Sequence, residues 1–252
     1  MNPGALDGRV AIVTGGGRGL GRALALALAG AGADVVVAAR GTQELARVAD
    51  EVRALGRRGL AVPMDVTVAA DAERLATTTL AELGRLDILV NNAGVLHGAP
   101  LLETRDEDWD RVVDTNLRGT FLCTRAAGRH LTAAGAGKVI NIVSNFALRG
   151  VAGYASYCAS KAGIAGFTRA IAVEWAPCNV QVNAIAAGYF ETDINADARA
   201  DPKLYDRLLR QIPARRMGRP EELGPLVVYL ASPAADFMTG ETVVIDGGQV
   251  IR

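Results

Sequence analysis

The segment GYASYCASK, residues 153–161, places two tyrosines and a lysine at the head of an apolar stretch that predicts a helix. Tyr157 and Lys161 are four residues apart and share one face of that helix, whereas Tyr154 has Cys158 at the same spacing. A phenol ionises near pH ~10, and a neighbouring ammonium lowers that pKa. Tyr157 is therefore the better acid–base candidate, with Lys161 as its tuning group. The alternative is a tyrosine at the helix start beside a solvated lysine.

A glycine-rich segment, TGGGRGLG at residues 14–21, leads from a β-branched run directly into a helical pattern. Glycine allows a tight turn and a close approach of the backbone to a diphosphate, and a helix N-terminus offers free N–H groups. Gly15, Gly19 and Gly21 depart from the strict G-x-G-x-x-G spacing. The segment could be a simple turn, but its place between the first strand and the first helix favours a dinucleotide site.

The residues that follow the second β-branched run bear on the choice of cofactor. This run ends in Ala38-Ala39-Arg40, without the carboxylate that binds the ribose 2′-hydroxyl in NAD sites. Arg40 and Arg18 instead suit a 2′-phosphate, which guanidinium groups bind with charge-assisted hydrogen bonds. The sequence therefore favours NADP(H) over NAD(H); the alternative is that both arginines are solvated surface residues.

Short β-branched runs alternate with Ala- and Leu-rich stretches along the whole chain of 252 residues. Nearly continuous apolar runs predict parallel strands that are covered on both faces. The alternation predicts one α/β domain over residues 1–252, a Rossmann-like doubly wound parallel seven-stranded sheet with helices on both faces. A polar segment interrupts it and predicts a substrate lid at about residues 190–216. The expected strands are 9–13, 34–38, 60–64, 86–90, 138–143, 180–185 and 242–245.

The composition is that of a globular protein, with 50% hydrophobic and 21% charged residues. Basic and acidic residues number 27 each, so the formal net charge is zero and predicts no binding of nucleic acid or of an anionic membrane. We find neither a signal peptide nor an apolar run long enough to span a membrane. The three cysteines and two histidines form no ligand cluster, which predicts no metal site and reduced thiols in a cytoplasmic protein.

Taken together, the motifs resemble the short-chain dehydrogenase/reductase family over nearly the full chain. The matching stretches, in the family's order and spacing, are TGGGRGLG (14–21), MDVT (64–67), NNAG (91–94), TNLRGTF (115–121), INIVS (140–144), YCASK (157–161) and TGETVVIDGG (239–248). The resemblance implies reversible hydride transfer between a nicotinamide and a ketone or secondary alcohol, and a homotetramer. The alternative is a nucleotide-binding sensor or scaffold that kept the fold without turnover.

The resemblance also implies roles for individual residues. Tyr157 would exchange a proton with the carbonyl oxygen, Ser144 would hydrogen-bond that oxygen, and Lys161 would hold the nicotinamide ribose and lower the pKa of Tyr157. Asn116 would anchor a water that relays protons, and Asp65 would face the adenine. The implied cofactor-binding set is Gly15, Gly17, Arg18, Gly19, Leu20, Gly21, Arg40, Asp65, Val66, Asn92, Ala93, Gly94, Tyr157, Lys161, Gly188 and Thr192.

The expected substrate walls are mainly apolar, with Arg149 as the nearest fixed charge, and favour a neutral ketone or secondary alcohol. The chain looks similar to gluconate 5-dehydrogenases and to 3-oxoacyl-carrier-protein reductases, but residues 175–178 carry no base that could dock an acidic carrier. Two residues depart from the family pattern: Ala187 replaces a proline, and Asn145 replaces a small residue. The expected substrate residues are Leu96, His97, Asn145, Phe146, Tyr154, Tyr189 and Phe190.

Overall fold

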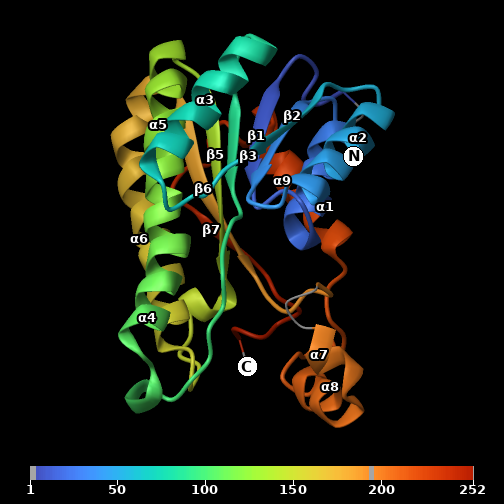
Figure 1. Ribbon diagram of the computed structural model, residues 1–252, viewed down its shortest axis with the longest axis vertical. Coiled ribbons are helices and arrows are strands. Elements are labelled where there is room, and N and C mark those ends of the chain that lie inside the picture. The colour runs from blue at the N-terminus through green and yellow to red at the C-terminus, as the bar shows by residue number, and fades with distance from the viewer. Residues whose placement is uncertain (1–3, 193–195, 252) are drawn as a thin grey trace.

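The computed structural model describes residues 4–192 and 196–251 of the chain. The described residues form one parallel sheet of seven strands in the order β3-β2-β1-β4-β5-β6-β7, with helices on both faces (Figure 1). This confirms the expected doubly wound α/β fold. The strands are β1 (Val10–Thr14), β2 (Asp34–Ala39), β3 (Gly59–Pro63), β4 (Ile88–Asn91), β5 (Gly137–Ser144), β6 (Val180–Ala187) and β7 (Thr242–Ile245).

The strand order reverses next to β1, which pairs with β2 on one side and with β4 on the other. Val13 is in register with Val37 of β2 and with Val90 of β4. The connections from β1 and from β4 therefore leave the sheet in opposite directions. In open parallel sheets such a switch point forms the ligand crevice, at the carboxyl ends of the strands. The glycine segment after β1 and the NNAG segment after β4 both lie there.

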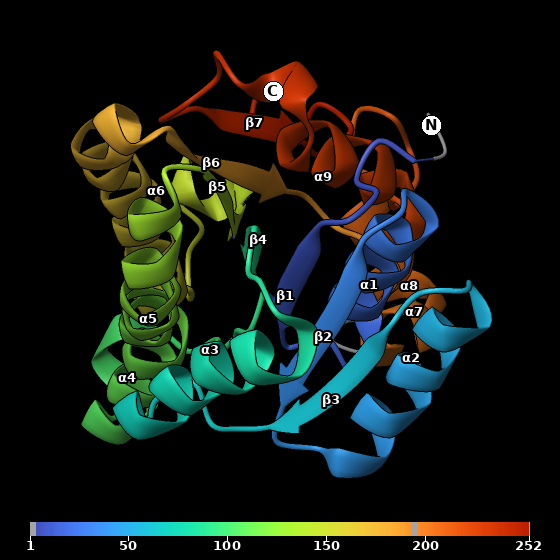
Figure 2. The ribbon, with the colours of Figure 1, turned by 90° about the horizontal axis from the view of Figure 1, so that it is seen from above.

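The helices form two layers, which Figure 2 shows on either side of the sheet. Helices α1, α2 and α9 cover one face, and α3, α5 and α6 cover the other. None of the helices that the structure describes is long and apolar enough to cross a membrane. The helices are α1 (Gly19–Gly30), α2 (Thr42–Ala54), α3 (Ala69–Leu83), α4 (Asp106–Val113), α5 (Gly119–Ala134), α6 (Ala155–Trp175), α7 (Ala196–Ala200), α8 (Pro202–Leu209) and α9 (Gly224–Ala231).

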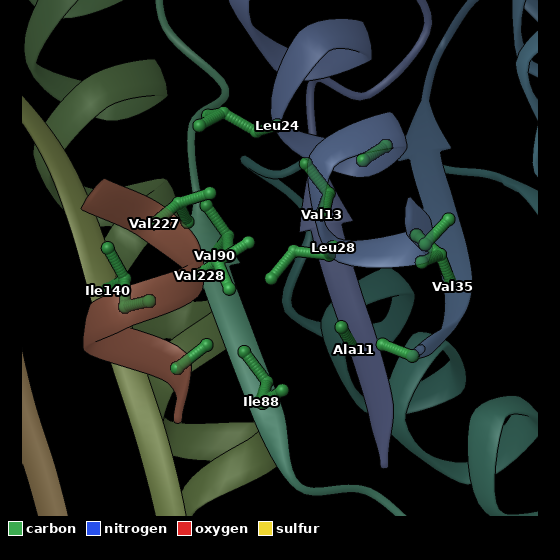
Figure 3. Close-up of a cluster of buried hydrophobic side chains, with 14 of the residues drawn as sticks. Ala11, Val13, Leu24, Leu28, Val35, Ile88, Val90, Ile140, Val227 and Val228 are labelled. Atoms are coloured by element: carbon green, nitrogen blue, oxygen red, sulfur yellow. The ribbon is translucent and has the colours of Figure 1, made fainter. Parts of the chain in front are cut away.

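Strand β1 is buried on both faces because its side chains alternate between two cores. Ala11 and Val13 pack with Leu24 and Leu28 of α1 in the core shown in Figure 3. Val10 and its alternate neighbour Ile12 belong to the core on the opposite face. This double burial accounts for the continuous apolar run and fixes the position of the glycine segment that follows it.

The segment expected to form a lid contains the two short helices α7 and α8, which Figure 1 shows beyond the end of the sheet. Asp201 caps α8 by accepting a hydrogen bond from the N–H of Lys203 at 2.8 Å. Behind α8 the chain returns to the body of the protein, where Ala214 N donates to Gly247 O at 3.0 Å. Residues 193–195 of this segment lie outside the described part of the chain. The lid function stays a prediction.

Candidate active site

The tyrosine and lysine of YCASK lie together on the first two turns of α6. The Lys161 ammonium nitrogen is 5.7 Å from the centroid of the Tyr157 ring, which confirms that the two side chains share a face. Lys161 is only 4% exposed and donates a hydrogen bond to Ile142 O in β5 at 2.8 Å. The pair is therefore held against the carboxyl half of a central strand.

Burial controls the ionisation of both groups. It raises the pKa of Tyr157 to about 12, against a smaller lowering by the hydrogen bond from Ser144. Burial also lowers the pKa of Lys161 from 10.5 to about 8, because the site disfavours the charged amine. We expected Lys161 to lower the pKa of Tyr157, but the lowering that the structure shows comes from Ser144. At neutral pH the phenol is protonated and can serve as a proton donor.

Ser144 lies at the end of β5, one residue before a short 3-10 turn. Its Oγ accepts a hydrogen bond from Phe146 N at 3.2 Å and contacts Asn145 Oδ1 at 3.4 Å. Ala187 of β6 is its register partner, so the position that departs from the family pattern is held as a strand residue. These contacts fix the serine hydroxyl beside Tyr157, where both groups can contact one substrate oxygen.

Asn116 occupies a π-helical turn (Asp114–Arg118) between α4 and α5 and is fully buried. Its Oδ1 accepts from Val95 N at 2.8 Å, and its Nδ2 donates to Val95 O at 3.0 Å and to Ser160 Oγ at 3.1 Å. The side-chain amide thus ties the loop after β4 to the helix that carries Tyr157. π-Helical turns are rare, and those that occur are frequently at functional sites. The water-anchoring role stays a prediction.

The glycine segment forms a cradle that a Cβ atom would fill. Gly15 has φ +64°, and a Cβ there would lie 2.9 Å from Ala93 Cα. A Cβ on Gly21 would lie only 2.1 Å from Gly15 O. Arg18, the residue just before the start of α1, does not cap this helix with its side chain. A narrow cradle that leads to an uncapped helix N-terminus fits the diphosphate of a dinucleotide.

Thr14 and Asn92 connect the two sides of the switch point. Asn92 Nδ2 donates to Thr14 O at 3.0 Å and to Gly15 O at 3.2 Å. Thr14 Oγ1 accepts from the backbone N–H groups of Asn92 and Ala93 at 3.0 and 3.1 Å. Thr14 was not among the expected site residues. Its signal in the sequence is a hydroxyl residue at the junction of an apolar run and the glycines.

The end of the crevice that we expect to bind the adenosine carries Arg40 after β2 and Asp65 after β3. Arg40 and Arg18 are both exposed. The Asp65 carboxylate accepts from Thr67 N at 2.9 Å and from Thr67 Oγ1 at 2.8 Å. The backbone hydrogen bond from Thr67 is the main cause that lowers the pKa of Asp65, and Arg40 adds to it. Asp65 therefore organises its own loop, and its contact with adenine stays a prediction.

The loop after β6 brings two further candidates to the crevice. A Cβ on Gly188 would lie 2.6 Å from Asp246 Cα, so the close approach of the two chains requires glycine there. A Cβ on Gly19 would lie 3.6 Å from Thr192 Cγ2, which places Thr192 beside the glycine cradle. The other candidates lie in the cradle, at the start of α1, and after β3 and β4: Gly17, Leu20, Val66 and Gly94.

The Phe146 ring contacts Tyr157 and two other expected substrate residues, Tyr154 and Tyr189. Its centroid lies 5.5 Å from Tyr154, 5.8 Å from Tyr157 and 6.2 Å from Tyr189, in edge-on contacts. Leu96 is 39% exposed in the loop after β4. The aromatic cluster is thus centred beside Tyr157.

Two other expected substrate residues contact parts of the fold outside this aromatic cluster. The His97 imidazole lies 3.8 Å from the Asp108 carboxylate and 3.5 Å from Arg111 Nη2, both on α4. Phe190 is 6% exposed and belongs to the core between the sheet and α1, against Gly218. The sequence did not show these contacts because their partners lie far along the chain.

Replacing Lys161 with methionine tests the burial of its amine. Between pH 8 and 10.5 the folded chain binds fewer protons at Lys161 than the unfolded chain, so wild-type stability rises with pH in this window. We expect the free energy of unfolding of wild type, relative to Lys161→Met, to increase by up to about 1.4 kcal/mol per pH unit there. Below this window the difference is constant. Urea titrations across the window measure it.

A difference between wild type and Lys161→Met that does not change with pH across this window would contradict the burial argument. It would show that the Lys161 amine is not held in a charge-disfavouring site.

A family model described as Enoyl-(Acyl carrier protein) reductase matches residues 15–249 of the chain. The chain is 42% identical over 249 residues to 2-dehydro-3-deoxy-D-gluconate 5-dehydrogenase of Escherichia coli, covering 98% of each. It is also 42% identical over 249 residues to a 3-oxoacyl-[acyl-carrier-protein] reductase of Synechocystis sp., covering 98% of this chain and 99% of that one.

Among solved structures, a gluconate 5-dehydrogenase from Burkholderia cenocepacia in complex with NADP and tartrate superposes with a TM-score of 0.95 at 37% identity. The superposition covers 100% of this chain and 98% of that one. The similarity therefore extends over the whole fold and includes every segment that forms the crevice.

Proposed function

Because the chain belongs to the short-chain dehydrogenase/reductase family of oxidoreductases, we propose that it interconverts a ketone and a secondary alcohol with NADP(H), using Tyr157 as the acid–base group. The observation that carries the proposal is the pair of half-buried Tyr157 and buried Lys161 on one face of α6, beside Ser144 and at the carboxyl edge of the sheet. The glycine cradle at the same edge supports the proposal that the cofactor is a dinucleotide.

The residues of this site divide the chemistry among themselves. A bound nicotinamide supplies or accepts the hydride. Tyr157 gives a proton to the substrate oxygen during reduction and takes it back during oxidation. Ser144 hydrogen-bonds the same oxygen, where negative charge develops and where stabilisation accelerates the step. Lys161 holds the cofactor ribose, and Asn116 fixes the loop and helix that surround the site.

For the substrate, we favour a sugar-acid or related small hydroxy compound over an acyl group on a carrier protein. Relatives with both kinds of name are equally similar in sequence. The observation that separates them is the end of α6, where residues 175–178 offer no basic side chain to dock an acidic carrier. A homotetramer, which the family resemblance implies, and a cytoplasmic location, which the unclustered cysteines favour, complete the proposal.

A substrate screen tests the proposed reaction against a non-catalytic role. The protein is mixed with NADPH and a panel of ketones, and with NADP⁺ and the corresponding alcohols, while nicotinamide absorbance is followed. Turnover of at least one pair supports the enzyme. Tight NADPH binding without turnover across the panel would instead favour a nucleotide sensor.

The preference for NADP(H) is tested by Arg40→Asp. The change removes a guanidinium and adds a carboxylate at the end of β2, so it should repel a 2′-phosphate and leave a 2′-hydroxyl site intact. We expect the NADPH Kd to rise about 10- to 100-fold, the loss typical of a charge-assisted contact, with a much smaller change for NADH. Fluorescence titration measures both. Equal weakening of the two cofactors would refute the 2′-phosphate role.

A further inference from the structure

Three hydrogen-bond donors near the Phe146 ring are buried and have no partner among the described residues: Asn145 Nδ2, Arg149 Nε and Gln249 Nε2. Asn145 is 2% exposed and Gln249 is 1% exposed. Buried polar groups are nearly always hydrogen-bonded, because an unpaired donor costs free energy. Three such donors around one aromatic cluster indicate a ligand that supplies acceptors.

The orientation of Gln249 is fixed by the protein. Its Oε1 accepts a hydrogen bond from Tyr189 N at 3.1 Å, which leaves the amide nitrogen as the unpaired end. The turn that carries it is anchored by Asp246, whose carboxylate accepts from Gly248 N at 2.9 Å and from Val250 N at 2.8 Å. Gln249 thus presents a donor, and not an acceptor, beside the loop that follows β6.

Arg149 brings the positive charge to this place. Its guanidinium carbon lies 5.6 Å from the centroid of the Phe146 ring, and its Nη1 contacts Gln249 O at 3.4 Å. Its charge also acts on the Tyr189 phenol, whose pKa it lowers against a larger increase from burial. No carboxylate lies within ion-pair distance of Arg149 in the part of the chain that the structure describes.

We propose that Arg149 and Gln249 form a carboxylate-binding subsite and that the substrate is a hydroxy acid or keto acid. An arginine with a free amide beside it matches the two oxygens of a carboxylate. Phe146 contacts both Arg149 and Tyr157, so the carboxylate lies apart from the reacting carbon. Asn145, the residue before Phe146, offers a further buried donor. The subsite rests on the proposed function and replaces the expectation of a neutral substrate.

The first test measures kcat/KM with NADP⁺ for an acid, gluconate, and for its neutral amide, gluconamide. Wild type should prefer the acid. Arg149→Gln should lower the acid-to-amide ratio about 10- to 100-fold, the loss expected for a charge-assisted contact. The matched control is Arg125→Gln, because Arg125 stacks on Phe121 of α5 at 4.9 Å and should not affect the ratio. An unchanged ratio in Arg149→Gln would overturn the subsite.

Gln249→Glu probes the second member without losing its structural contact. A carboxylate can still accept the hydrogen bond from Tyr189 N, but it replaces the free donor with a negative charge. The acid-to-amide ratio should fall at least as far as in Arg149→Gln, because the new charge repels the substrate carboxylate. A ratio equal to that of wild type would remove Gln249 from the subsite.

A binding measurement separates this proposal from the proposed reaction. Cyclohexanecarboxylate and cyclohexanecarboxamide have no hydroxyl to oxidise, so calorimetric titration with NADP⁺ present does not depend on turnover. Tighter binding of the acid, lost in Arg149→Gln, supports the subsite even if no substrate is turned over. Equal binding of acid and amide to wild type overturns the subsite, even if neutral alcohols are oxidised.

Discussion

Tyr157→Phe is expected to lower kcat/KM for the best substrate by about 10²- to 10⁴-fold, the range that a positioned proton donor contributes. The change removes one hydroxyl from a half-buried ring that Phe146 and Lys161 already contact, so the ring packing should survive. The dinucleotide Kd should stay within about twofold, because the lost group acts on the substrate oxygen. Stopped-flow kinetics and fluorescence titration measure the two quantities.

Tyr154→Phe is the matched control for this variant. Tyr154 also contacts the Phe146 ring, at 5.5 Å, but lies outside the pair formed by Tyr157 and Lys161. Its loss should affect kcat/KM far less than that of Tyr157. If both variants lose activity equally, or if Tyr157→Phe keeps most of its turnover, the assignment of the proton donor is wrong.

The sequence predicts the strands well because their signal is local. The run at 9–13 corresponds to β1 at Val10–Thr14, a shift of one residue. At β4 the expected start at residue 86 differs from the observed Ile88, because Asp87 leaves the apolar pattern and binds Arg85 and Arg9. Apolar runs therefore locate a strand, whereas ion pairs with distant residues set its ends.

The candidate site was predictable only where its geometry is local. Tyr157 and Lys161 meet because residues four apart share a helix face, and the spacing alone shows this. Gln249 enters the site through a hydrogen bond to Tyr189, 60 residues earlier in the chain. Phe190, an expected substrate residue, instead lies in the core and packs against Gly218. Contacts of this kind have no periodic signature in the sequence.

The direction of the Tyr157 pKa shift is the clearest difference between expectation and structure. The spacing argument considered one neighbouring charge, whereas burial is a property of the whole fold and dominates here. The same burial weakens the argument from Lys161, since it lowers the pKa of the amine and thus its tendency to carry charge. Burial at the edge of the sheet can therefore reverse the direction of a pKa shift that was inferred from two residues on one helical turn.

Gly21→Ala tests the glycine cradle, on which the dinucleotide proposal depends. The new Cβ would lie 2.1 Å from Gly15 O and 2.6 Å from Asn92 Nδ2, so the loop must move. That carbonyl is itself held by Asn92, which ties β1 to β4. We expect the free energy of unfolding to fall by about 1–3 kcal/mol, as for an overpacked core, and NADPH binding to weaken more than about tenfold.

Gly30→Ala makes the same chemical change at the other end of the same helix. Gly30 is exposed, and a Cβ there would meet no atom within 4 Å. Alanine favours a helix by up to about 1 kcal/mol relative to glycine, so this variant should be as stable as wild type or more so, with normal NADPH binding. Urea denaturation and fluorescence titration of both variants decide the matter. If Gly21→Ala behaves like Gly30→Ala, the cradle is not a close-approach site, because its glycines then serve only as a flexible turn.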